Sequence, residues 1–274
     1  MGASDLAHIN SLLMATTPHI KRLFFDIETS PCIGYFWRPG YKVNLSYENI
    51  LEDNKIICIC YKWQHKDEVH SLTWDSKQND KKMLQKFIKV ANKADELVGH
   101  NGDRFDLKWV KTRCLKHNIP AFPKYATLDT LKAARGTFLF NSNRLDYIAQ
   151  FLGEGEKTET GGFQLWKDVM MGDKEALANM VEYCENDVVI LQKVWERMKN
   201  YVPHKTSIRS QEQDLPKYCC PECGNTNVYL NKTRSTAMGT IQRDMHCKTG
   251  CGKYFRISNK SYMDLLLDRA KNKV

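Results

Sequence analysis

Two acidic residues stand two positions apart in the short apolar segment 22–28, as Asp26 and Glu28. If this segment is a β-strand, its side chains alternate between two faces, so both carboxylates share one face and Ile27 points to the other. Acids flanked by Leu and Phe residues are costly to bury unless a metal ion or a basic group compensates their charge. The pair therefore predicts a divalent-cation site, and the alternative is an exposed edge strand with its polar side chains in solvent.

A third acid follows another predicted strand. The segment 100–106 reads as a strand end that turns through Gly102 into a helix, and the first turn of that helix carries Asp106. The ends of sheet strands are where α/β proteins place ligands, so Asp106 is a candidate functional carboxylate. Asp103, in the same turn, is interpreted as a helix cap because Asp is favoured at helix starts.

A fourth acid lies in a long predicted helix that runs from residue 174 to about residue 201. Tyr183 and Asp187 are four positions apart, which places a phenol and a carboxylate on one helical face. The phenol and the carboxylate therefore point the same way from this helix. The alternative for Tyr183 is a core position, since Met180, Val188 and Leu191 are apolar neighbours on the same helix.

A separate cysteine-rich segment predicts a metal site of another kind. Its paired spacing gives two knuckles, each followed by a glycine, with the ligands Cys220, Cys223, Cys247 and Cys251. Four thiolates in tetrahedral array are typical of structural zinc and leave no open position for catalysis. Cys219 and His246 adjoin the two knuckles and are alternative ligands.

The elements that must position these groups follow from hydrophobic spacing. Strand-like segments are 22–28, 56–62, 68–72, 97–100 and 127–129, with 56–62 and 68–72 expected to form a hairpin. Helical spacing covers 83–91, 105–117, 130–135, 145–152 and 174 to about 201. Segments 32–54 and 153–163 are expected to be loops. Antiparallel and βαβ-type connections are mixed in this order, which predicts an α/β sandwich.

Composition sets the class of protein. Hydrophobic residues make up 42% of the 274 residues and charged residues 27%, which is typical of a globular chain and excludes disorder as its main state. No segment has the apolar length of a membrane span, and we expect no membrane association. The start of the chain lacks a signal-peptide pattern, so we expect an intracellular protein with reduced cysteines.

Positive charge gathers towards the end of the chain. Residues 205–274 carry 13 Lys or Arg against 6 Asp or Glu, while the whole chain has a formal net charge of +9. A basic surplus in a small module suggests a polyanionic partner. Basic side chains that could touch phosphates are Lys232, Arg234, Arg243, Lys248, Lys253 and Arg256, and docking of a protein partner is the competing role.

Taken in chain order, the acids form a joint pattern of D-x-E, N-x-x-x-F-D and Y-x-x-x-D. This pattern resembles the D-E-D-D exonuclease superfamily of the ribonuclease H-like fold. It is similar to the tyrosine class, which includes the proofreading domains of family B DNA polymerases, because the histidine class would need His where Glu182 stands. The resemblance covers about residues 22–255 and extends to standalone bacterial and phage exonuclease-like proteins with a terminal zinc ribbon.

The resemblance implies a role for each matched residue. Asp26, Glu28 and Asp187 would hold one Mg²⁺ or Mn²⁺ ion, and Asp26 with Asp106 a second. Tyr183 would orient the attacking water, since its ordinary pKa of about 10 makes it a poor base at neutral pH. Matching residues near the strand end, Asn101 and Phe105, would contact the substrate.

Other residues near these motifs have structural interpretations. We expect Asp129 to be a helix N-cap and Asp146 to lie on a helix surface. Trp166 either lines the path of a nucleic-acid strand or serves as a buried anchor.

The resemblance also predicts the domains: a ribonuclease H-like exonuclease domain at 20–203, a linker at 204–216, a zinc ribbon at 217–258 and a helical tail at 259–274. The expected fold is a mixed sheet flanked by helices, followed by a small C-terminal zinc ribbon with one structural Zn²⁺.

The expected activity is metal-dependent 3′-5′ exonuclease hydrolysis of DNA, on single strands or 3′ ends, in DNA repair or replication. The partners would be nucleic acid and a polymerase or other replication protein in trans. The expected location is the cytoplasm of a bacterium or a phage-infected host cell. The alternatives are an exoribonuclease, a structure-specific nuclease, or a non-catalytic nucleic-acid-binding adaptor.

Overall fold

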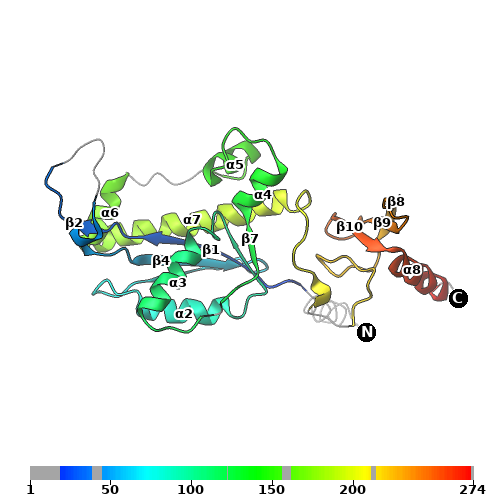
Figure 1. Cartoon of the computed structure of the whole chain (residues 1–274), viewed down its shortest axis with the longest axis horizontal. Helices are drawn as coiled ribbons and strands as arrows, with labels where there is room; N and C mark the ends of the chain where they lie inside the picture. Colours follow the sequence, from blue (N-terminus) through cyan, green and yellow to red (C-terminus); the bar gives the residue numbers. More distant parts are fainter. Residues whose placement is uncertain (1–18, 39–44, 122, 156–161, 211–213, 273–274) are drawn as a thin grey trace, which may run out of the picture. The chain divides into compact units, whose positions relative to one another are not determined.

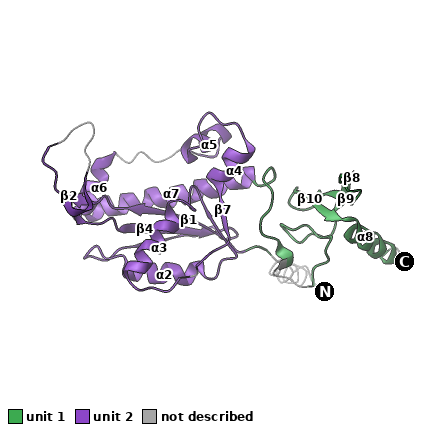
Figure 2. Cartoon of the chain, in the orientation of Figure 1, with its two compact units in different colours: residues 1–20, 199–274 green, residues 21–198 purple. Residues whose placement is uncertain are grey.

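The computed structural model describes residues 19–38, 45–121, 123–155, 162–210 and 214–272. Contacts divide the chain into two compact units, one of residues 21–198 and one that joins residues 1–20 with 199–274 (Figure 2). Each unit has its own buried core. The expected domain boundaries at 20–203, 204–216, 217–258 and 259–274 remain predictions. Within the described ranges, no helix combines the length and apolar character that crossing a membrane would require.

The larger unit is built on a five-stranded mixed sheet in the order β5-β4-β1-β6-β7. Its central strand is β1 (Arg22–Thr29), an apolar segment buried along most of its length. The strands β4 (Ile56–Trp63) and β5 (Val69–Thr73) form the antiparallel half of the sheet, and the hairpin between them is confirmed. β6 (Glu96–Gly99) and β7 (Thr127–Asp129) run parallel to β1 and form the other half.

Helices cover both faces of this sheet (Figure 1). The helices α2 (Lys81–Ala91) and α3 (Asp106–Lys116) contact each other and β4 on one face. On the other face the long helix α7 (Lys174–Met198) packs along β1 and β4. The shorter helices beside α7 are α4 (Thr130–Thr137), α5 (Leu145–Leu152) and α6 (Phe163–Met170).

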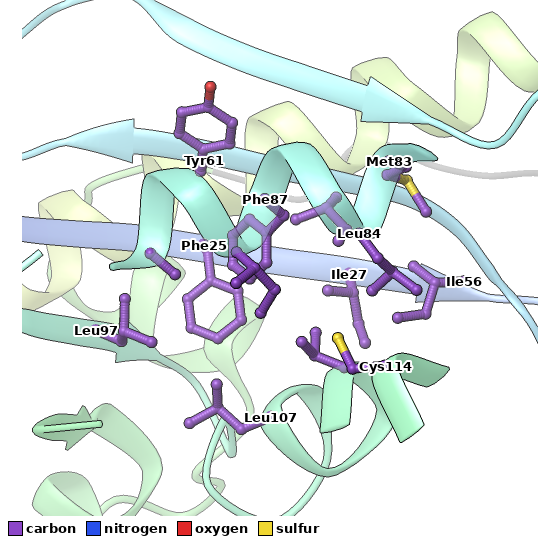
Figure 3. Close-up of a cluster of buried hydrophobic side chains, with 14 of the residues drawn as sticks. Phe25, Ile27, Ile56, Tyr61, Met83, Leu84, Phe87, Leu97, Leu107 and Cys114 are labelled. Carbon is purple, nitrogen blue, oxygen red and sulfur yellow. The ribbon is translucent and has the colours of Figure 1, made fainter. Parts of the chain in front are cut away.

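An apolar core lies between the sheet and the α2–α3 layer (Figure 3). Phe25 and Ile27 project from β1 into this core, where the Phe25 and Phe87 ring centroids are 5.4 Å apart. Side chains alternate along a strand, so this arrangement turns Asp26 and Glu28 towards the α7 face. The packing of two apolar residues thus decides where the acids point.

A buried polar network ties the α2–α3 layer to the sheet. The carboxylate of Asp80, which is 0% exposed, accepts hydrogen bonds from Arg113 Nε at 2.7 Å and from the backbone N–H of Ile56 at 3.1 Å. His117 Nε2 lies 2.6 Å from its other oxygen. Burial opposes ionisation of Asp80, but the hydrogen bonds outweigh it and lower the carboxyl pKa.

One of the two segments expected to be loops contains regular structure, and α6 begins at the last residue of the other, 153–163. The segment 32–54 includes β2 (Ile33–Gly34), the 3₁₀ turn Tyr47–Asn49 and β3 (Ile50–Glu52), with β2 and β3 paired. The helix α6 was not predicted, because its Gly-Gly start reads as a turn and its eight residues give few helical repeats. Residues 39–44 and 156–161 of these segments lie outside the described residues.

The smaller unit contains a three-stranded antiparallel sheet in the order β10-β9-β8. Its elements are the 3₁₀ turn Ile208–Ser210, β8 (Tyr229–Ser235), β9 (Ile241–His246), β10 (Tyr254–Ser258) and α8 (Asn259–Lys271). The Ser258 hydroxyl caps α8 by accepting from the N–H of Ser261. The apolar core of the smaller unit contains Val228, Met245 and Phe255 together with the cysteine knuckles.

Candidate nuclease site and cysteine cluster

Asp26 and Glu28 lie on the face of β1 that is covered by α7, and both are half-buried. Their partners in the antiparallel register with β4 are Cys60 and Cys58 respectively. From α7, the Cys184 thiol donates to the backbone carbonyl of Asp26 over 3.6 Å. The two acids therefore stand beside a patch of cysteine side chains.

This patch consists of Cys58, Cys60 and Cys184, whose sulfur atoms lie within 4.8 Å of one another and are all buried. Burial raises the pKa of the Cys184 thiol well above its usual range. A hydrogen bond with Cys184 is the largest cause of the raised pKa of Cys60. These thiols are neutral near pH 7 and pack as small apolar groups beneath the carboxylates.

Asp106 is the first residue of α3, after the turn that follows β6, and it is only 3% exposed. Burial raises the pKa of its carboxyl to about 7, and the negative charge of Asp129 adds to this effect. Backbone N–H groups of Ile27 and of Asp106 itself bond to the carboxylate and oppose the shift. The bond from Ile27 places Asp106 beside the strand positions of Asp26 and Glu28. A cation would relieve the cost of ionising this buried acid.

Asp187 and Tyr183 come from the middle of α7, with Asp187 4% exposed and Tyr183 half-buried. Asp187 and Asp26 line the same cavity, which has a volume of about 570 Å³. The fold thus places Asp187 and Asp26 in the lining of one cavity. It also places Asp106 against β1, where the carboxylate accepts a hydrogen bond from the N–H of Ile27. Carboxylate oxygens are the hard ligands that Mg²⁺ and Mn²⁺ prefer, so the donor set fits these ions.

The two residues expected to touch substrate lie at the turn between β6 and α3. Asn101 has a positive φ of 67°, and its backbone N–H donates to Asp129 Oδ1 at 3.0 Å. Phe105 is 41% exposed and makes an edge-on contact with Trp109. The turn is tight, because a Cβ on Gly102 would lie 3.1 Å from Gly99 Cα. Both substrate roles remain predictions.

Two expectations for neighbouring residues have clear outcomes. Asp129 is confirmed as the N-cap of α4, since its side chain accepts from the N–H groups of Leu131 and Lys132. The expectation that Asp103 caps α3 is wrong. The N-cap position there is Phe105, and Asp103 instead pairs with Lys132 at 2.7 Å, because the chain turns once more before the helix begins.

The indole of Trp166 is half-buried, and its Nε1–H donates to the Thr29 carbonyl at 3.1 Å, which fits the anchor interpretation. The cavity also contains residues to which the sequence assigned no role. Arg135 and Arg144 line it together with Asp146, which was expected only on a helix surface. No local spacing predicts this arrangement, because Arg135 belongs to α4, whereas Arg144 and Asp146 lie at the start of α5.

In the smaller unit four cysteine sulfurs gather within 4.8 Å of one another, those of Cys220, Cys223, Cys247 and Cys251. Hydrogen bonds from Cys220 and Cys251 hold the pKa of the Cys223 thiol well below its usual range. A Cβ on Gly250 would lie only 2.6 Å from Cys247 Sγ, so the knuckle closes tightly on its sulfur. The four thiols fit tetrahedral zinc.

The alternative ligands lie outside this cluster. Cys219 is fully buried, but its sulfur is not among the four that gather. His246 stacks on Tyr254 with parallel rings whose centroids are 4.1 Å apart. We therefore assign the proposed zinc site to the four clustered cysteines.

The basic side chains of this unit are not all available to a partner. Lys253 is 1% exposed and donates to the carbonyls of Lys199 at 2.8 Å and Val202 at 3.2 Å. Its expected contact with phosphates is therefore wrong: a lysine amine buried without partners would be unstable, and here it binds backbone oxygens. Arg234 and Arg256 both pair with Asp244, whereas Lys232 and Lys248 are exposed.

Comparison with known proteins agrees with this geometry. A family profile described as the RNase_H superfamily matches residues 23–199. Among solved structures, the chain is similar to the family B DNA polymerase from the hyperthermophilic archaeon Pyrobaculum calidifontis, with a TM-score of 0.50 and 16% identity.

The similarity covers 67% of this chain but only 25% of the polymerase. At that identity it concerns the fold alone. None of the curated protein sequences matches the chain. The family match spans the central sheet from Leu23 onwards together with α7, and it contains all four candidate acids. The chain therefore belongs to the RNase H superfamily.

Proposed function

We propose that this protein is a metal-dependent 3′-5′ exonuclease that removes nucleotides from the 3′ end of DNA. The observation that carries the proposal is that Asp26 of β1 and Asp187 of α7 line one cavity. Asp106 of α3 accepts from the N–H of Ile27, the residue between Asp26 and Glu28. A structural role would not need several carboxylates where burial raises the pKa of one of them to about 7.

The four carboxylates would hold two Mg²⁺ or Mn²⁺ ions, with Asp26, Glu28 and Asp187 at the first and Asp26 with Asp106 at the second. Bound ions of this kind lower the pKa of water and stabilise the charge on a leaving oxygen during phosphoryl transfer. The protein contributes the fixed positions of the oxygens. The N–H of Ile27 holds Asp106 in place, and the packing of α7 on β1 holds Asp187.

Tyr183 acts as an orienting group in this proposal. It lies one helical turn before Asp187 on α7, on the same face, and its ring is half-buried. A hydroxyl held there can accept or donate one hydrogen bond to water without changing its charge. Its role is to fix the direction of attack on the phosphate.

Single-stranded 3′ ends fit the site better than paired ends. Three of the acids are buried or half-buried between the sheet and α7, so a strand must enter the cavity end-on to reach them. The exposed ring of Phe105, next to Asp106, provides a surface on which a terminal base can stack. Asn101 would contact the same nucleotide from the β6–α3 turn.

The proposed zinc site has a structural role and takes no part in hydrolysis. Its four thiols close the coordination shell, and the knuckles pack with the core of the smaller unit. Exposed Lys232 and Lys248 would add phosphate contacts that do not read bases.

The test is digestion of 5′-labelled single-stranded DNA and RNA by the purified full chain with Mg²⁺ or Mn²⁺. We expect a ladder that shortens from the 3′ end and stops in EDTA. Asp26→Ala should abolish it. Asp103→Asn is the matched control, because this acid lies in the same turn as Asp106 but pairs with Lys132, and its activity should stay within about threefold of wild type.

The outcomes separate the competing activities. A ladder of shortened products from RNA but not from DNA would identify the protein as an exoribonuclease. Internal cuts, without progressive shortening, would indicate a structure-specific nuclease. Absence of cleavage by a folded, zinc-loaded protein that still binds the strand would contradict the proposal and favour a binding adaptor.

A further inference from the structure

The cavity that contains Asp26 and Asp187 has a second, oppositely charged side. Its lining includes Arg135, near the end of α4, and Arg144, at the start of α5. Both arginines are exposed to solvent. α4 and α5 lie on the α7 side of the sheet, so their residues can face the acids across the cavity (Figure 1).

These two arginines differ from the arginines that stabilise the fold. Arg22 pairs with Glu96 at 2.7 Å, Arg113 with Asp80 at 2.7 Å and Arg197 with Glu154 at 2.6 Å. Within the described part of the chain, Arg135 and Arg144 form no ion pair. Their charges are therefore available to an anion that enters the cavity.

Arg144 occupies a position where its charge does not serve the helix. It is the N-cap residue of α5 and forms no side-chain capping bond. A cation at a helix N-terminus faces the positive end of the helix dipole, which destabilises the helix slightly. Residues favoured there are Ser, Thr, Asp and Asn. An arginine at this position is consistent with a role in binding.

The loop before Arg144 is fixed to the strand end that carries the site. His100, the residue after β6, donates from Nε2 to the Asn143 carbonyl at 2.9 Å, and its Nδ1 lies 2.9 Å from the Thr130 hydroxyl. The ring thus joins the loop to the start of α4. This bridge holds the backbone of Arg144 against the same end of the sheet from which Asp106 extends.

We propose that Arg135 and Arg144 bind the phosphodiester backbone of the substrate strand, at a phosphate adjacent to the one that is cleaved. The inference rests on the proposed nuclease function and adds the residues that hold the strand. A polyanion entering a cavity lined by Asp26, Asp146 and Asp187 is repelled unless cations compensate. Guanidinium groups match the paired oxygens of a phosphate, and such contacts set position without reading sequence.

Binding is tested first, in EDTA, so that the result does not depend on cleavage. The probe is a fluorescein-labelled single-stranded DNA of about 12 nucleotides, titrated over a range of salt concentrations. We expect Arg135→Ala and Arg144→Ala each to raise Kd about fivefold and to reduce the slope of log K against log salt by about one. Asp146→Asn should lower Kd, because it removes a negative charge from the same cavity.

The matched control is Lys89→Ala, which removes the same charge from an exposed position of α2, on the opposite face of the sheet. It should change Kd by less than about twofold. Arginine variants that bind like Lys89→Ala, with an unchanged salt slope, would overturn the inference.

Cleavage then locates the phosphate. In separate substrates, single linkages 5′ to the scissile bond are replaced by neutral methylphosphonates. At one linkage, the replacement should reduce the kcat/KM of the wild type about fivefold. The same replacement should leave the kcat/KM of Arg135→Ala or Arg144→Ala almost unchanged, because the arginine that contacts this phosphate is already absent. Additive losses at every linkage would contradict the contact. If the wild type does not cleave at all, the proposed function fails, while the binding experiment still decides the inference.

Discussion

The backbone N–H of Ile27 donates a hydrogen bond to the carboxylate of Asp106, across the boundary between β1 and α3. Ile27 stands between Asp26 and Glu28, and its side chain is packed in the core on the opposite face of the sheet. The side chain of Ile27 therefore anchors β1 in the core, while its backbone N–H holds the carboxylate of Asp106. This bond holds Asp106 beside the strand positions of the acid pair.

Asp106→Asn should stabilise the metal-free protein while it abolishes cleavage. The carboxyl pKa is about 7 in the folded state, above its ordinary value of 3.8. The folded state therefore holds this proton more tightly, and stability falls as pH rises from about 4 to about 7. At pH 8 the amide avoids the buried charge and can still accept from Ile27, so we expect a gain of about 1–3 kcal/mol.

Thermal unfolding in EDTA at pH 5 and pH 8 measures this effect. The Tm difference between variant and wild type should appear mainly at pH 8, because the wild-type carboxyl is protonated at pH 5. An equal loss of Tm at both pH values would show that the hydrogen bond matters more than the charge. Digestion assays should show a loss of at least about 1000-fold in kcat.

Tyr183→Phe should slow hydrolysis without weakening strand binding. The ring stays in its half-buried position on α7, and only the hydroxyl is lost. If that hydroxyl orients water, kcat should fall about tenfold or more while KM changes little. Steady-state digestion of labelled single strands gives both constants. Wild-type kcat in the variant would assign the tyrosine to packing.

Asp80→Ala should destabilise the larger unit by about 3–5 kcal/mol, because it leaves the Arg113 guanidinium buried without its carboxylate. The lowered pKa of Asp80 also predicts a pH effect. Its contribution to stability is present above pH about 4 and is lost as pH falls through the folded-state pKa.

Denaturant unfolding of wild type, Asp80→Ala and Asp80→Asn from pH 2 to pH 7 tests this network. The stability difference should be largest at neutral pH and should shrink in acid, where the wild-type carboxyl is protonated. A difference that does not change with pH would mean that packing, and not charge, dominates at this position. Asp168→Asn is the control, since the Asp168 side chain accepts a hydrogen bond from the exposed Gln164 on α6 and pairs with no arginine among the described residues.

Gly250→Ala should weaken zinc binding, because the new Cβ would lie 2.6 Å from Cys247 Sγ and 3.2 Å from Cys223 Sγ. Either sulfur would have to leave its position in the cluster, and zinc affinity should fall by about tenfold or more. Competition with a chromogenic zinc chelator measures the change. Gly136→Ala is the control, as a Cβ there meets nothing within 4 Å. Unchanged zinc affinity in Gly250→Ala would contradict the tetrahedral assignment.

The sequence by itself determined the elements and the chemistry they carry. Alternation in the segment around Asp26 and Glu28 predicted their common face, the four-residue spacing of Tyr183 and Asp187 predicted theirs, and paired cysteines predicted a four-thiol cluster. These are local properties, because strand and helix geometry fix the direction of neighbouring side chains wherever the element lies. For the same reason the central sheet and most helices were predicted to within a few residues.

Only the tertiary structure decided which distant residues meet. The bond from Ile27 to Asp106, the two arginines in the cavity and the burial of Lys253 all depend on how separate segments pack. The charge of Lys253 gave no sign that it would bind backbone carbonyls, and Asp103 could not be assigned until the start of α3 was known. Packing places side chains through the whole core, so such contacts have no signature in local spacing.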